Sequence, residues 1–70
     1  MDSADLVLRW AAARQRLTLA EDSGDWAAAE LEAEAGRREL AELEARMTAG
    51  ELREARRLFD AWFKRYLEED

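Results

Sequence analysis

The chain has 70 residues, a mass of 8.1 kDa and a formal net charge of −6 at pH 7. Ala, Glu, Leu, Arg and Lys fill 47 of the positions, whereas Pro, Cys, His, Ile and Asn are absent. Without Cys or His the chain can form no zinc finger, disulfide framework or imidazole base, and one Val leaves little for a sheet. The composition predicts an all-α chain, a single helical domain over residues 1–70, with no catalytic, cofactor-binding or metal-binding residues.

The charge and the hydropathy pattern restrict the partners. An acidic surface is unsuited to a phosphate backbone, so we expect no nucleic-acid partner. The apolar runs are too short to cross a membrane, and the acidic residues 1–5 do not resemble a signal peptide. We therefore expect a cytoplasmic protein that binds neither a membrane nor a small-molecule substrate.

The first helix is predicted over residues 3–22. Its main apolar stripe, with spacings that alternate between four and three residues, consists of Leu6, Trp10, Ala13, Leu17 and Ala20. A second stripe, on roughly the opposite side of the helix, consists of Leu8, Ala12 and Leu19. A lone three-helix bundle gives each helix one buried face, so the second stripe predicts an interface. After this helix, Gly24 suits the left-handed position beyond a helix end, and Ser23 or Asp25 suits the next N-cap.

The second helix is predicted over residues 25–47 and carries a strict heptad seam. The seam consists of Trp26, Ala29, Ala33, Gly36, Leu40, Leu43 and Met47. Its first half is small, and Gly36 costs about 1 kcal/mol against Ala in a helix interior. Close approach of another backbone is the predicted compensation, with the large side chains of the third helix packed on this half. Leu31 lies off the seam, and the Glu residues that flank it predict a solvated face.

The third helix is predicted over residues 49–68. Thr48 and Glu51 have the spacing of a capping box, with Met47 and Leu52 at the hydrophobic staple positions. The seam of this helix is aromatic and is widened by two flanking apolar residues; it comprises Leu52, Ala55, Leu58, Phe59, Trp62, Phe63 and Tyr66. The aromatic side chains suit either a core or a partner-binding hot spot, and the sequence leaves both readings open.

Short connections make neighbouring helices antiparallel. The prediction is an up-down-up arrangement, either a closed three-helix bundle or a helical hairpin plus third helix completed by a second copy. In both cases we expect assembly as a homodimer. The candidate interface residues are Leu8, Ala12, Leu19, Leu31, Leu58, Trp62, Phe63 and Tyr66.

Two short stretches resemble known families. Residues 24–29, Gly-Asp-Trp-Ala-Ala-Ala, resemble the turn between the two helices of a tetratricopeptide repeat, in a single copy. Residues 17–43 are similar to the start of FliT-type flagellar export chaperones, which are small cytoplasmic helical proteins that cover their clients with amphipathic helices. This resemblance implies a client-masking role and transfers no functional residue.

The sequence thus favours a small acidic protein-interaction module, an adaptor or regulatory subunit that acts through apolar and aromatic helix faces. One alternative is a cytoplasmic chaperone or inhibitor that masks a client protein, in the manner of a flagellar export chaperone or an antitoxin. Another is a purely structural assembly unit.

Overall fold

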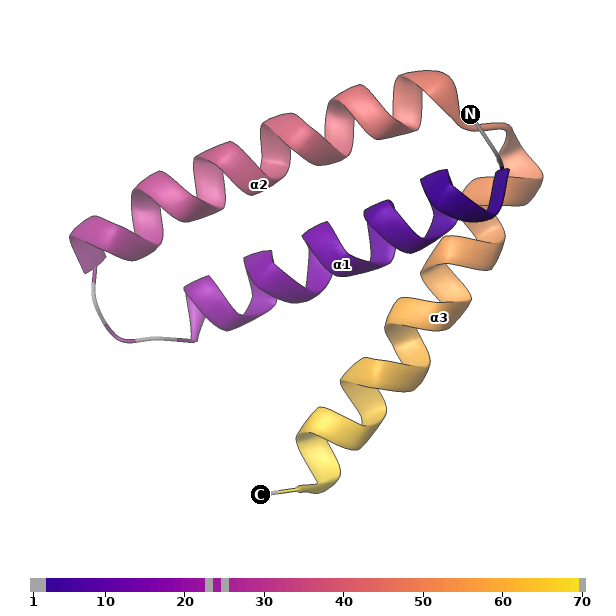
Figure 1. Ribbon diagram of the computed structural model, residues 1–70. Helices are drawn as coiled ribbons and strands as arrows, with labels where there is room; N and C mark the ends of the chain where they lie inside the picture. Colours follow the sequence, from indigo (N-terminus) through magenta and orange to yellow (C-terminus); the bar gives the residue numbers. More distant parts are fainter. Residues whose placement is uncertain (1–2, 23, 25, 70) are drawn as a thin grey trace.

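The computed structural model describes residues 3–22, 24 and 26–69 and is all-α over this part of the chain. It contains α1 (Ser3–Glu21), α2 (Trp26–Arg46) and α3 (Ala49–Glu68). These bounds lie within one residue of the predicted ones. Helices α1 and α2 form an antiparallel hairpin, and α3 returns beside α1 (Figure 1).

The helices begin and end at the glycine and capping residues that the sequence predicts. Gly24 has φ +80°, a left-handed conformation that glycine adopts without a Cβ penalty. At the start of α3, Thr48 Oγ1 accepts a hydrogen bond from the backbone N–H of Glu51 at 3.2 Å. The Thr48 N–H donates in turn to Glu51 Oε1 at 2.9 Å, which completes the predicted capping box. The predicted N-cap positions Ser23 and Asp25, and the Trp26 side chain, lie outside the described residues.

Helix α1 is the central element of the fold. It packs along both α2 and α3, whereas α2 and α3 touch each other far less. The two outer helices diverge from their junction at residues 47–48 (Figure 1). The result is a three-helix bundle that opens away from this junction. It is flat, with principal extents of 34 × 27 × 15 Å.

The core is apolar. Trp10 of α1 is 5% exposed, and its ring meets Phe59 of α3 edge to face, with the centroids 6.4 Å apart. Its indole N–H donates to Glu44 at 3.2 Å, so the polar end of this side chain is satisfied. The buried cluster comprises Leu6, Val7, Trp10, Ala13, Leu17, Ala33, Leu40, Leu43, Ala55 and Phe59.

The small half of the α2 seam packs against α1, so the prediction that it faces the aromatic helix is wrong. A Cβ placed on Gly36 would lie 3.5 Å from Leu17 Cβ of α1. The cause is the divergence of the outer helices: at the level of Gly36, α1 is the helix beside α2. The approach is close, but 3.5 Å is an ordinary van der Waals separation, and a methyl group fits there.

Candidate interaction surface

One side of α1 is apolar and uncovered. Leu8 is 61% exposed and Leu19 is 48% exposed, whereas Leu17 on the core side is 3% exposed. Leu8 and Leu19 are eleven residues apart, about three turns, and therefore project in nearly the same direction. Ala12 is exposed between them and Gln15 is half-buried. We call Leu8, Ala12, Gln15 and Leu19 the outer stripe.

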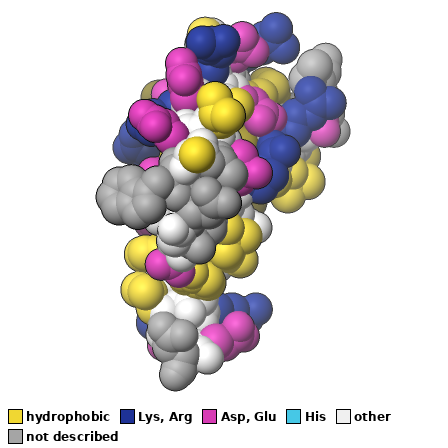
Figure 2. All heavy atoms as spheres, turned by 90° about the vertical axis from the view of Figure 1, so that its left-hand side faces the viewer, with side chains coloured by type: hydrophobic (Ala, Val, Ile, Leu, Met, Phe, Trp, Pro, Cys, Tyr) yellow, Lys and Arg dark blue, Asp and Glu magenta, His cyan; other side chains and the backbone are white. Residues whose placement is uncertain are grey.

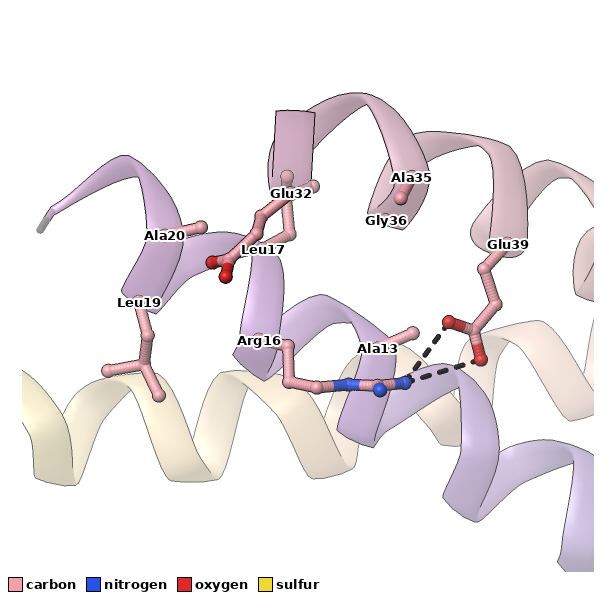
Figure 3. Close-up of a pocket in the computed structure, with 9 residues that line it drawn as sticks. All are labelled: Ala13, Arg16, Leu17, Leu19, Ala20, Glu32, Ala35, Gly36 and Glu39. Carbon is pink, nitrogen blue, oxygen red and sulfur yellow. Dashed lines mark hydrogen bonds and ion pairs between the residues drawn. The ribbon is translucent and has the colours of Figure 1, made fainter. Parts of the chain in front are cut away.

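A shallow depression of about 500 Å³ borders the outer stripe where α1 meets α2. Ala13 and Leu19 of α1 and Ala35 and Gly36 of α2 are among the residues that line it (Figure 3). The Leu19 side chain points away from α2 in this view. The depression adds small residues of a second helix to the apolar surface, and the charged residues Arg16, Glu32 and Glu39 line it as well.

The basic residues next to the outer stripe are neutralised within the chain. Arg16 Nη2 lies 3.1 Å from a carboxylate oxygen of Glu39 on α2, an ion pair drawn in Figure 3. Arg9, seven residues earlier on the same line, lies 3.3 Å from Asp5. Exposed pairs of this kind add little to folding stability. Their consequence here is that both basic side chains beside the stripe are already paired within the chain.

Helix α3 adds one exposed leucine to the same side of the molecule. Arg56 and Asp60 line a groove on the opposite side. Leu58 lies midway between Arg56 and Asp60 in the sequence, two residues from each. Two residues correspond to about 200° around a helix, so Leu58 points away from that groove. It is 43% exposed.

The aromatic residues of α3 are tied to one another and to α1. Phe59 is in the core, and the Phe63 ring stacks on it with centroids 5.6 Å apart. The rings of Trp62 and Tyr66 stack at 5.1 Å, and the Tyr66 hydroxyl donates to a carboxylate oxygen of Asp22. Trp62, Phe63 and Tyr66 are half-buried, so Leu58, at 43%, is the most exposed of the predicted α3 candidates.

The groove on the other side of α1 has a different character. It measures about 550 Å³, and its apolar lining includes Trp10, Leu40 and Phe59. The Arg14 guanidinium lies over the Phe59 ring, 5.2 Å from its centroid, in a cation–π contact. Each of the three helices also contributes one basic and one acidic residue, which are Arg14, Glu21, Arg37, Glu44, Arg56 and Asp60.

Leu31 stands apart from the other predicted interface residues. It is 71% exposed. It lies two residues before the buried Ala33. Two residues correspond to about 200° around a helix, so Leu31 is on the side of α2 that faces away from α1. The structure thus brings Leu8, Ala12 and Leu19 together and leaves Leu31 on the edge. Figure 2 views the end where α1 joins α2, and it shows acidic, basic and apolar side chains interspersed.

Two contacts have no signal in the sequence: Arg14 over Phe59 and Tyr66 with Asp22. Both join residues more than forty positions apart. The spacing marks Phe59 and Tyr66 as residues of an aromatic seam, but it does not mark Arg14 or Asp22 as their partners. Within the described residues, no group of three or more acidic side chains is placed to hold a metal ion. No described helix is both long and apolar enough for a membrane crossing.

No family model, curated protein sequence or solved structure matches the chain. The likeness to flagellar export chaperones therefore rests on residues 17–43 alone.

Proposed function

We propose that this chain is a non-catalytic helical protein-interaction module, an adaptor or regulatory subunit, which assembles as a homodimer. The observation that carries the proposal is the surface area. The chain exposes 5326 Å². A compact monomer of its mass exposes about 4,500 Å² on the general scaling of surface with mass. The excess of about 800 Å² equals the share that each partner contributes to a standard protein–protein interface.

The nature of the exposed side chains supports the same proposal. Among the described residues, the large apolar side chains that remain exposed are Leu8, Leu19, Leu31, Leu58 and Leu67. Single exposed leucines are common on soluble proteins. Leu8 and Leu19, however, lie on one line of one helix, with Ala12 between them, and such a stripe is the usual contact surface of a helix that packs against another helix.

The size of the chain points in the same direction. A core of this size supplies about 3–5 kcal/mol, and small folds usually add a disulfide, a metal or a partner. The sequence contains no Cys and no His. The devices that remain are tight helix packing, self-association and a partner. In this proposal the apolar faces serve association, and no residue is assigned a catalytic role.

The test is a sedimentation-velocity dilution series on the unmodified chain. We expect a species of about twice 8.1 kDa that dissociates to the monomer as the protein is diluted through its dissociation constant. A mass of 8.1 kDa at every concentration, up to the highest that remains soluble, would overturn the homodimer. The client-masking role would then be the better account of the exposed leucines.

A further inference from the structure

We infer that the second copy docks on the outer stripe in an antiparallel two-fold arrangement, with Leu8 of one protomer packed on Leu19 of the other. This inference rests on the proposed function and deepens it, because it assigns the surface, the direction and the register of the contact. The surface is the outer stripe, and the groove on the other side of α1 stays open.

The spacing of the outer stripe is symmetric, as a two-fold contact requires. An isologous interface uses the same patch on both subunits, so that the patch must be its own complement. The stripe residues follow spacings of four, three and four. The pairs Leu8/Leu19 and Ala12/Gln15 therefore share one midpoint. An antiparallel partner that turns about this midpoint places each leucine on a leucine and each Ala12 on the longer Gln15, which leaves no large gap.

Helix polarity favours the antiparallel direction. The carboxyl end of α1 carries Glu21 and Asp22, next to the negative end of its helix dipole. A parallel partner would place two such ends side by side. An antiparallel partner places each of them beside the amino end of the other α1, where the dipole favours negative charge. The Asp5 side chain that this register brings opposite Asp22 is already paired with Arg9 at 3.3 Å.

The charges favour the outer stripe over the groove. Two chains of net charge −6 repel each other, and a contact costs least where the charged side chains are already paired within each chain. Beside the outer stripe, Arg9 and Arg16 are paired with Asp5 and Glu39. In the groove, no ion pair of Arg14, Arg37 or Arg56 occurs in the part of the chain that is described. A second copy seated there would desolvate these charges, which is costly without partners of matched geometry.

The flat shape of the protomer provides enough area for a dimer interface. One face of the molecule measures 34 by 27 Å, which has room for the about 800 Å² that each side of a standard interface contributes. Ala12 at the centre lets the two α1 helices approach closely. Leu58 of α3 and Ala35 of α2 lie to the two sides of α1, so the contact extends beyond a single pair of helices.

Disulfide trapping tests the register directly, because the chain has no cysteine of its own. Leu8→Cys and Leu19→Cys are made as separate proteins, mixed to allow exchange of subunits, and oxidised. Each variant carries a single cysteine, so every disulfide joins two chains. In the proposed register the two copies of residue 8 in one dimer are about 16 Å apart along α1, beyond the about 7 Å that a disulfide spans, and the same holds for the two copies of residue 19. We expect a covalent dimer in the mixture and none when either variant is oxidised alone.

The matched control is Leu67→Cys, an equally exposed leucine that follows Asp60 by seven residues and so lies on the groove side of α3. Mixed with Leu8→Cys, it should give no covalent dimer. Circular dichroism confirms that each variant retains its helices.

Trapping of each variant with itself would overturn the antiparallel direction. No trapping in any mixture, for a chain that sediments as a dimer, would overturn the outer stripe as the contact while the proposed function stands. A monomer in the dilution series would overturn both.

Discussion

The two sides of α1 carry the same kinds of residues and have opposite environments. Leu17 on the inner side is 3% exposed, and Leu19, about 200° further around the helix, is 48% exposed. The inner side has two helices to pack against, and the outer side has none among the described residues. The comparison teaches that the residue type alone does not set burial in this fold. A central helix with two apolar sides is half covered, and the exposed half is what makes a second copy necessary in our account.

The largest effect that separates the two sides is expected from a matched pair of truncations. Leu17→Ala removes a core side chain against Gly36 and should lower the free energy of unfolding by about 2–5 kcal/mol. Leu19→Ala removes a side chain that is exposed in the protomer. At low protein concentration it should change the free energy of unfolding by less than about 0.5 kcal/mol. Urea unfolding followed by circular dichroism measures both.

Unfolding measured at several protein concentrations separates the two variants further. Dimerisation adds stability that grows with protein concentration, so the deficit of Leu19→Ala should grow as the protein is concentrated, while that of Leu17→Ala stays constant. Equal deficits for the two variants at low concentration would show that Leu19 is already covered in the protomer, and the distinction between the two sides would fail.

A smaller effect of opposite sign is expected at Gly36. The new Cβ of Gly36→Ala meets Leu17 at an ordinary contact distance, and alanine is favoured over glycine in a helix interior by about 1 kcal/mol. The variant should unfold at a higher urea concentration, because the methyl group raises helix propensity and meets no clash. A loss of stability would mean that Leu17 cannot accept even a methyl group.

Local structure was predictable from the sequence because it depends on residues close along the chain. Thr48 and Glu51 are three residues apart and form their capping box regardless of what packs around them. The same holds for the left-handed turn at Gly24 and for the extents of the three helices. Periodicity also placed Leu8 and Leu19 on the side of α1 away from its main stripe, where the structure shows them exposed.

The partner of each buried stripe was not predictable in this way. The heptad pattern of α2 shows which side is buried, but the covering helix depends on how α3 leaves the junction at residues 47–48. That is why Gly36 faces Leu17 of α1 instead of the aromatic side chains of α3. The aromatic residues show the same limit: their spacing marks one face of α3, yet Phe59 is in the core and Leu58 beside it is 43% exposed.

The central claim is that the outer side of α1 is a protein contact, and the most direct measurement is the solution mass of a charge-substituted pair. Leu8→Glu and Leu19→Glu, introduced together, place two carboxylates on the outer stripe, and Leu67→Glu places one on the groove side. By light scattering we expect the unmodified chain and Leu67→Glu to have the dimer mass, and the double variant to have the mass of a single chain with its helicity intact. A double variant that keeps the mass of the unmodified chain would contradict the account.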